Sequence, residues 1–272
     1  MISVLNSVSQ LGAENALSAT QSSLQNSLLQ LSTGLKINSG ADDPAGISIA
    51  AGLGANLAAL TQSSQNASNG VGLLQTADGA LSQVSSLLTA AVTLATEASN
   101  GQLTAAQSTA ANTAYQSILT EITQIGSTTN FNGTAVFSAT PITTFTSDGT
   151  AGGTTTTSTT TGALSSTTLA LNTTALTSTA AASTALTAIT AAINTVAASR
   201  GTIGASVNQL TADTSVENTE VTNLTGAQNN VQNADIGTTV AKMTQYNVLE
   251  QTGMAALSQS NQAEQAVLKL LQ

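Results

Sequence analysis

The stretch LSTGLKINSGADDPAGISIA, residues 31–50, joins two long amphipathic helical patterns. Before it, leucines recur at the spacing of one helical face: Leu17, Leu24, Leu28, Leu31 and Leu35. Gly34 and Gly40 interrupt that pattern, and Asp42-Asp43-Pro44 then supplies a helix start. An aspartate accepts hydrogen bonds from the free N–H groups of a first turn, and proline fits the first helical position. The stretch therefore predicts a hinge at 36–43 between two helices.

Two helices are predicted after the hinge. The first runs from Pro44 to about Asn100, where Asn-Gly is a C-terminal stop. Its apolar seam comprises Leu53, Leu57, Leu60, Ala67, Val71, Leu74, Leu81, Leu88, Val92 and Ala95. The polar members of this seam are Ser64, Asp78 and Ser85. The next helix ends at Gly126 and carries one apolar stripe, formed by Tyr115, Ile118, Ile122 and Ile125.

Between residues 134 and 182 the helical period disappears. Residues 134–137 and 142–146 favour strands, and Asn132-Gly133 and Asp148-Gly149 are turn signals. Threonine prefers an extended backbone, so this Thr-rich segment predicts hairpins, with a disordered linker as the alternative. Its hydroxyls are also candidate O-glycosylation sites: Thr154, Thr155, Thr156, Thr157, Ser158, Thr159, Thr160 and Thr161.

The fourth predicted helix, residues 183–233, has the longest register. Its seam alternates in steps of three and four through Leu186, Ile189, Ile193, Val196, Arg200, Ile203, Val207, Leu210, Thr214, Glu217, Val221, Leu224, Gln228 and Val231. Such persistence predicts a supercoiled rod. Thr214 and Glu217 break the apolar face, either to fix the register at a cost in stability or because this face meets water there.

The last predicted helix, residues 234–272, resembles the first in being amphipathic and sparsely charged. Its apolar face is Val240, Met243, Leu249, Met254, Leu257, Val267, Leu268, Leu270 and Leu271. Because packing supplies most of the stability of a helix, these terminal helices need partners. An intramolecular bundle would provide them, and so would assembly with other copies.

Composition excludes an ordinary globular core and several classes of function. Aromatic residues are 2% of 272 residues, and charged residues are 6%, against about 25% in an average domain. With a formal net charge of −9 and four cations (Lys36, Arg200, Lys242 and Lys269), no basic surface for nucleic acid or an anionic membrane is expected. No apolar run approaches 18 residues, so no membrane span is expected either.

The sequence also lacks residue types on which many catalytic sites depend. The chain has no Cys and no His, which excludes thiol and imidazole metal sites and His-based triads. The acid pair Asp42 and Asp43 stands at a helix start, where a capping role suits it. We therefore predict no catalytic, cofactor or metal site, and no enzyme. The predicted fold is mainly α: a long antiparallel helical coiled-coil rod with a small β-hairpin-rich tip.

Several motifs together resemble bacterial flagellin. Residues 31–39, LSTGLKINS, with Asp42-Asp43 and Ala45-Gly46, are similar to its N-terminal signature, and NFNG at 130–133 resembles the turn after its second long helix. Near the other end, QTG at 251–253, LSQSNQ at 257–262 and QAVLKLL at 265–271 resemble its C-terminus. The motifs cover both termini and the junctions in the expected order.

The resemblance implies a layout. Residues 1–35 and 234–272 would be inner-tube helices that pair into a coiled coil in the assembled filament. Residues 36–133 and 183–233 would form the surrounding spoke layer, and the Thr-rich segment 134–182 would stand in place of outer domains. The expected subunit interface comprises Leu17, Leu24, Leu28, Leu31, Leu35, Met243, Leu249, Met254, Leu257, Val267, Leu268 and Leu271.

The resemblance also implies a function: self-assembly into the flagellar filament used for swimming. The chain would be extracellular, exported through the flagellar secretion channel without a cleaved signal peptide. Its partners would be other copies, an export chaperone, and cap and hook-junction proteins, with neither nucleic acid nor membrane. The alternatives are a hook–filament junction protein and a soluble helical bundle used for binding.

One family feature is missing. In flagellins seen by the vertebrate Toll-like receptor, the positions corresponding to Ala90 and Val92 are typically arginine. The patch Ala90, Val92 and Leu94 is therefore expected to be inactive toward such a receptor.

Overall fold

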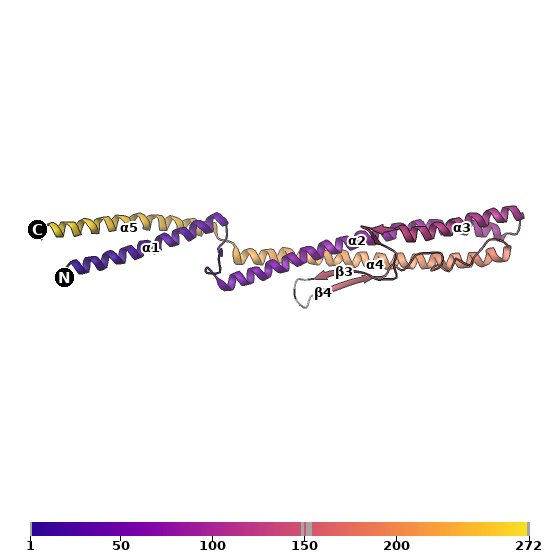
Figure 1. The fold of residues 1–272 in the computed structure, drawn as a ribbon, viewed down its shortest axis with the longest axis horizontal. Coiled ribbons are helices and arrows are strands. Elements are labelled where there is room, and N and C mark those ends of the chain that lie inside the picture. Colours follow the sequence, from indigo (N-terminus) through magenta and orange to yellow (C-terminus); the bar gives the residue numbers. More distant parts are fainter. Residues whose placement is uncertain (1, 148–149, 151–153, 271–272) are drawn as a thin grey trace. The chain divides into compact units, whose positions relative to one another are not determined.

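A computed structural model describes residues 2–147, 150 and 154–270 of the chain (Figure 1). Its helices are α1 (Ile2–Thr33), α2 (Pro44–Ser99), α3 (Ala105–Thr128), α4 (Thr179–Gln232) and α5 (Ile236–Leu270). The strands are β1 (Asn130–Phe131), β2 (Thr134–Ala135), β3 (Ile142–Ser147) and β4 (Thr154–Thr159). The chain forms two compact units: unit 1 comprises Met1–Ala55 and Asn223–Gln272, and unit 2 comprises Asn56–Thr222. The predicted mainly α fold with a small β component is confirmed.

In unit 1 the two terminal helices lie side by side and antiparallel (Figure 1). The Gln10 amide donates to Asn261 Oδ1 at 2.9 Å, and the Gln21 amide donates to Glu250 Oε1 at 3.1 Å. Small residues allow close approach, since a Cβ on Gly253 would lie 3.3 Å from Leu17 Cδ1. The pairing predicted for the filament is thus already made within one chain, along a seam that contains polar and small residues.

Backbone hydrogen bonds tie the ends of this helix pair together. Gly34 ends α1 with φ +72°, a left-handed conformation that glycine adopts without steric cost. The Lys36 N–H donates to Gln232 O at 2.6 Å, and the Ala234 N–H donates to Gly34 O at 2.9 Å. These two hydrogen bonds hold the segment that follows α1 against the segment that precedes α5.

The predicted hinge is a hydrogen-bonded turn organised by two aspartates. Asp42 Oδ2 accepts from the backbone N–H groups of Asn38 at 3.0 Å and Ser39 at 2.8 Å, and these bonds lower the pKa of its carboxyl. Asp43 Oδ1 accepts from the N–H groups of Ala45 at 3.1 Å and Gly46 at 2.9 Å. Helix α2 begins at Pro44, as predicted from the sequence.

Removing the Asp43 cap is expected to weaken unit 1. Asp43→Ala leaves two N–H groups of the first turn without their acceptor, which costs about 1 kcal/mol at a typical N-cap. Asp43→Asn keeps an acceptor oxygen and serves as the control. Urea unfolding followed by circular dichroism measures both variants, and equal stability of the Ala and Asn variants would contradict the capping role.

Unit 2 is built on the antiparallel pair of α2 and α4, with α3 folded back beside α2 (Figure 1). Buried residues recur every seven positions along α2 in two rows, as in a coiled coil. One row is Leu60, Ala67, Leu74, Leu81, Leu88 and Ala95, and the other includes Ser63, Ala77, Val84, Ala91 and Ala98. The buried polar member of this seam is Ser63; the predicted Ser64, Asp78 and Ser85 are half-buried beside it.

The α2–α4 pair carries a bidentate ion pair. Arg200 Nε and Nη2 donate to the two carboxylate oxygens of Asp78 at 2.7 and 3.1 Å. The guanidinium holds the pKa of Asp78 below its ordinary value. Both side chains remain about 40% exposed, with fractions of 38% and 41%, so water and salt screen the pair and its contribution to stability is small.

The segment between α3 and α4 confirms the predicted hairpins but not their position. Strands β1 and β2 pair around the Asn132-Gly133 turn, and β3 and β4 pair from Ile142↔Thr159 to Ser147↔Thr154. The Asp148-Gly149 turn signal lies outside the described residues. The β3–β4 hairpin lies against the middle of α2 instead of forming a tip. A contact that shows this is the hydrogen bond from the Asn66 amide to Phe145 O at 3.3 Å.

Residues 160–178 form an irregular segment that covers α3. The Thr161 hydroxyl donates to Val136 O at 2.6 Å, and the fully buried Tyr115 hydroxyl bonds the hydroxyl of Thr174. Gly126 packs so closely that a Cβ there would lie 1.9 Å from Leu164 O. The glycine is thus needed for packing and does not end the helix: α3 continues through Gly126 to Thr128, two residues past the end predicted from the sequence.

Candidate assembly surface

Three large apolar side chains of α1 are open to solvent, on a side of the helix that also carries the exposed Asn15, Ser18, Ser22, Gln25 and Asn26. Val8 is 64% exposed, Leu11 is 59% exposed and Leu29 is 49% exposed. Spacings of three and eighteen residues are close to whole numbers of helical turns, so these three side chains share one face. This face is distinct from the half-buried row of Leu17, Leu24 and Leu31, which packs toward α5.

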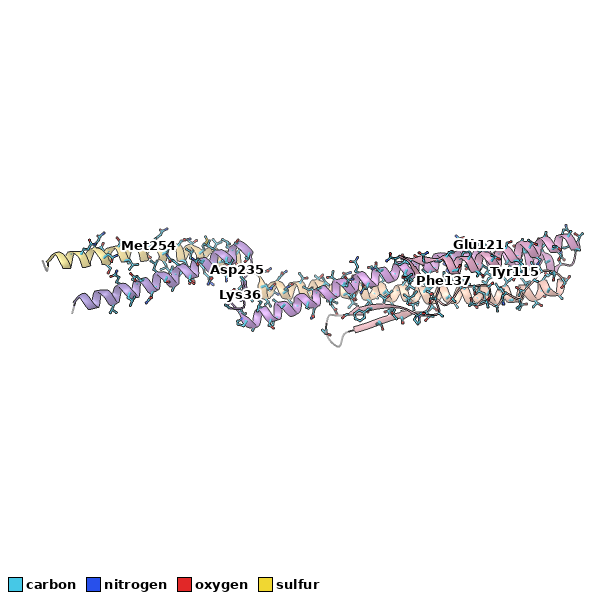
Figure 2. All side chains as sticks on the ribbon, viewed as in Figure 1. Lys36, Tyr115, Glu121, Phe137, Asp235 and Met254 are labelled. Carbon is cyan, nitrogen blue, oxygen red and sulfur yellow. The ribbon has the colours of Figure 1, made fainter. Side chains whose placement is uncertain are left out.

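Helix α5 also has large apolar side chains open to solvent. Ile236, Val240 and Met254 share one side, because they are separated by four and fourteen residues. Met254 is 48% exposed and is labelled on α5 in Figure 2. Val248 and Leu249 add exposed apolar area elsewhere around the helix. Single exposed leucines are ordinary on a protein surface, and the exposed apolar residues of these two helices, which lie side by side, are a candidate interaction surface.

The structure divides the predicted interface residues into three groups. Leu28, Leu249 and Met254 are exposed. Half-buried within unit 1 are Leu17, Leu24, Leu31, Leu35, Met243 and Leu257. The side chains of Val267 and Leu268, and all of Leu271, lie outside the described residues. The predicted list thus contains residues that are half-buried within unit 1 and residues that are exposed, and its role as a subunit interface stays a prediction.

Several exposed apolar residues were missing from that list. They are Val8, Leu11, Leu29, Ile49, Ile236, Val240 and Val248. The sequence could have identified them as the apolar residues of each helix that do not belong to its main seam. Residues of the main seam are buried when the two helices of one chain pair, and the leftover apolar residues stay exposed.

The surface of unit 1 offers little charge for recognition. The chain has 4 cations and 13 acids. Between α1 and α5, the described contact that involves a charged side chain is the hydrogen bond from the neutral Gln21 amide to the Glu250 carboxylate. Among the described residues, no group of three His, Cys, Asp or Glu side chains could hold a metal ion. Apolar burial is therefore the main source of affinity available to this surface.

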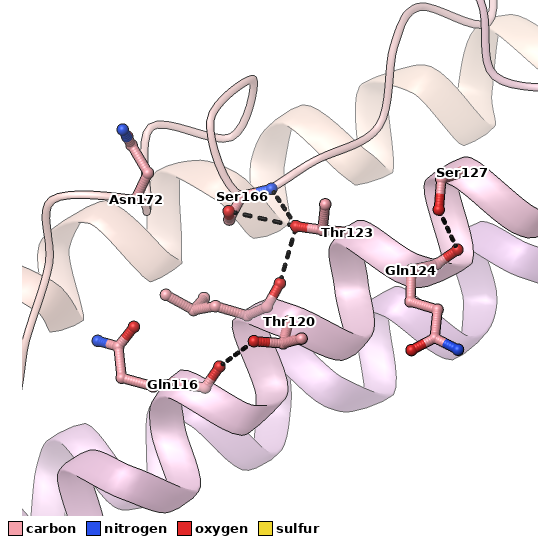
Figure 3. A pocket seen from close by; sticks show the side chains of 8 residues that line it. Gln116, Thr120, Thr123, Gln124, Ser127, Ser166 and Asn172 are labelled. Atoms are coloured by element: carbon pink, nitrogen blue, oxygen red, sulfur yellow. Dashed lines mark hydrogen bonds between the residues drawn. The ribbon is translucent and has the colours of Figure 1, made fainter.

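A groove of about 380 Å³ lies between α3 and the segment that covers it (Figure 3). Its lining is uncharged, and many of its hydroxyls are already engaged. Thr120 donates to Gln116 O at 3.0 Å, and Thr123 donates to Leu119 O at 2.9 Å while accepting from the Ser166 N–H at 3.1 Å. The groove is thus built from internal hydrogen bonds of the fold.

The candidate glycosylation run is partly buried, which corrects the expectation of an exposed hydroxyl surface. Thr157, Thr159 and Thr161 are at most 8% exposed and cannot carry a sugar in the folded chain. Thr156, Ser158 and Thr160 point outward. The side chains of Thr154 and Thr155 lie outside the described residues. Alternation along β4 places every second hydroxyl against the helices.

The candidate receptor patch lies on α2. Ala90 is exposed, whereas Val92 and Leu94 are half-buried against the core of unit 2. None of the three carries a charge or a hydrogen-bonding side chain. The patch thus lacks the cations that the family resemblance associates with receptor recognition.

Two helices have the length and hydropathy of a membrane span, although none was expected from the sequence. By length and composition alone, α2 and α4 are long and apolar enough to cross a membrane, with window mean hydropathies of 1.3 and 1.4. Both helices are rich in alanine, which raises the mean hydropathy without a long run of large apolar residues. In unit 2 both helices bury polar groups, Ser63 on α2 and Glu217 on α4, in one seam.

Two paired terminal helices with exposed apolar side chains and a second, largely helical unit define a mainly helical protein. The family model of the bacterial flagellin N-terminal helical region matches residues 4–141, and that of the bacterial flagellin C-terminal helical region matches residues 186–271. The chain belongs to the bacterial flagellin family.

Individual relatives match part of the chain. It is 39% identical to a flagellin of Serratia marcescens over 140 residues, which are 51% of this chain and 40% of that protein. It is 38% identical to the phase 1 flagellin of Salmonella naestved over 133 residues, 49% of this chain and 26% of that protein. The crystal structure of Bacillus cereus flagellin aligns at a TM-score of 0.49 and 29% identity, covering 56% of this chain and 88% of that one. The aligned segments thus span less than half of the Serratia and Salmonella relatives.

Proposed function

We propose that this chain is a structural subunit that self-assembles into the bacterial flagellar filament used for swimming. The observation that carries the proposal is the set of exposed apolar side chains on α1 and α5, the same helices that lie in the two flagellin family matches. Heterologous contacts through such side chains build an open helical polymer when the rotation between copies does not close a ring. The proposed role is structural and not enzymatic.

The proposed setting follows the family. The subunit would work outside the cell, after export through the flagellar channel. Partners would include an export chaperone, the cap and the hook-junction proteins. A hook–filament junction role is less well supported, since the family matches and the similar relatives are flagellins.

Electron microscopy tests the proposal directly. Purified chain, dissociated in acid and returned to neutral pH, is expected to form long filaments of uniform diameter, seeded by filament fragments. Soluble monomers that persist after seeding, or closed rings, would overturn the filament role and favour the junction role or a binding bundle.

Assembly is expected to depend little on salt. Affinity comes from apolar burial, and few exposed ion pairs exist for salt to screen. The polymer fraction measured by sedimentation at low and high NaCl should be nearly equal. A large loss of polymer at high salt would show that ion pairs hold the filament together.

Recognition by the vertebrate Toll-like receptor is expected to be poor, because Ala90 and Val92 provide no cation. A receptor-activation assay on cultured cells measures this. Potency equal to that of an enteric flagellin would sink the prediction, while the double substitution Ala90→Arg and Val92→Arg should raise activation.

A further inference from the structure

A carboxylate interrupts the buried row of α4. In that row, buried residues follow one another every seven positions: Ala182, Ile189, Val196, Ile203, Leu210 and then Glu217. On α2, Ser63 occupies the corresponding row with Ala77 and Val84. Glu217 and Ser63 therefore form a polar layer in a coiled-coil seam, and Glu217 does not face water.

The layer is the centre of a hydrogen-bonded chain that reaches the β3–β4 hairpin. Glu217 is 6% exposed and Ser63 is 2% exposed. The Ser63 hydroxyl donates to Glu217 Oε1, and the Ser147 N–H at the end of β3 donates to Ser63 Oγ at 2.8 Å. Glu217 Oε2 is buried without a hydrogen-bond partner among the described residues. An ionised carboxylate in this position is incompletely solvated.

The hairpin is docked on the helices at the same level. The Asn66 amide donates to Phe145 O, and a Cβ on Gly70 would lie 2.6 Å from Thr144 Oγ1. On the α4 side, the Gln209 amide reaches Thr157 Oγ1 at 3.5 Å. Lifting the hairpin would open Ser63, and through it Glu217, to water.

The charges around Glu217 do not compensate it. On α4, Asp213 and Glu220 lie one turn before and one turn after it, and both are acids. From α2 the neutral Ser63 donates a hydrogen bond to it, and from β3 the Ser147 N–H donates in turn to Ser63. Arg200 is engaged by Asp78, and the three lysines belong to unit 1. Asp148, which follows β3, lies outside the described residues.

We propose that Glu217 is a proton-operated latch: when protonated it allows the β3–β4 hairpin to close over the α2–α4 seam, and when ionised it loosens the hairpin. The proton comes from solvent and returns to it, so no other reactant is needed. Burial raises the pKa of Glu217, and the neighbouring Asp213 and Glu220 raise it further, against the opposing bond from Ser63.

The sign of the pH dependence follows from this arrangement. A carboxyl whose pKa is higher in the docked state binds its proton more tightly there than in the open state. Docking is therefore strongest below the ordinary value of 4.5, weakens as pH rises to the raised pKa, and is constant above it.

Hydrogen exchange of the Ser147 amide, measured by NMR on the full chain under conditions that keep it monomeric, tests the latch. Its protection factor, corrected for the intrinsic pH dependence of exchange, is expected to fall by up to about tenfold per pH unit within that window. The ¹³C shift of the Glu217 carboxyl should titrate with the same midpoint. A protection factor that does not change with pH would overturn the proposal.

Variants separate Glu217 from other acids. Glu217→Gln imitates the protonated form and should keep Ser147 protected at every pH, without the slope. Glu121→Gln, the same change at an exposed position on α3, and Asp148→Asn should both retain the slope. The proposal is overturned if Glu217→Gln keeps the slope, or if Asp148→Asn removes it. Should Glu217→Gln fold poorly, the wild-type carboxyl titration still decides, because a midpoint at or below 4.5 excludes the latch.

Discussion

Replacing Val240 and Met254 together by aspartate is expected to abolish filament formation at concentrations where the unchanged chain polymerises. Both side chains lie on one open side of α5, so the α1–α5 pair within the chain should survive the change. Burying two such side chains contributes about 3 kcal/mol or more to each contact. Because 1.4 kcal/mol corresponds to about tenfold in affinity, the critical concentration should rise at least about a hundredfold.

The matched control keeps the same positions apolar. Val240→Ile with Met254→Leu should assemble almost as the unchanged chain does, because the area available for burial is nearly the same. Sedimentation gives the critical concentration, and circular dichroism checks that both variants remain helical. Normal polymerisation of the double aspartate variant would remove α5 from the assembly surface.

Gly126→Ala is expected to destabilise unit 2 strongly. A Cβ at this position would lie 1.9 Å from the carbonyl oxygen of Leu164 and 2.8 Å from its carbonyl carbon, so the backbone of the covering segment must move. Overpacking of this kind typically costs about 1–3 kcal/mol and sometimes more. The helix-propensity gain of about 1 kcal/mol from replacing glycine offsets part of that cost.

Gly79→Ala is the matched control for that variant. Gly79 also lies within a helix, but a Cβ there would have no atom within 4 Å. This substitution should therefore stabilise the protein by up to about 1 kcal/mol. Thermal or urea unfolding of the two variants should shift in opposite directions. Equal shifts would show that Gly126 does not pack against Leu164 as described.

Periodicity and end signals predicted most of the elements of this fold. Pro44 starts α2, and Asn132-Gly133 turns β1 into β2, because the physical cause of each is local. The exact seam was less predictable, since Ala and Ser residues carry little pattern. Ser63 is buried where Ser64 was expected, and the buried Ala182, Ala185 and Ala192 were not included in the predicted seam of α4.

Long-range contacts were outside the reach of the sequence. Gly126 resembles a helix end, yet Leu164, which lies far along the chain, is the reason that a glycine is needed there. The hairpin was expected at a tip, but nothing local in β3 specifies its contact with Asn66. For the polar position at Glu217, two explanations were open, and burial favours a polar layer within the seam over exposure to water.

The assembly surface expected on the terminal helices stays a prediction. Both terminal helices were expected to carry it, but their leucines were assigned to one interface. Leu17, Leu24 and Leu31 are half-buried within the chain, while Val8 and Leu11 are open to solvent. A single amphipathic pattern does not distinguish an intramolecular partner from an intermolecular one.

The most direct test of the central claim compares the full chain with a version lacking residues 1–35 and 235–272, both examined by electron microscopy after return from acid to neutral pH. We expect filaments from the full chain and soluble, helical monomers from the shortened one, because the shortened chain keeps unit 2 but loses the exposed apolar side chains of α1 and α5. Filaments formed equally well by the shortened chain would place assembly in unit 2 and contradict the proposed role of the terminal helices.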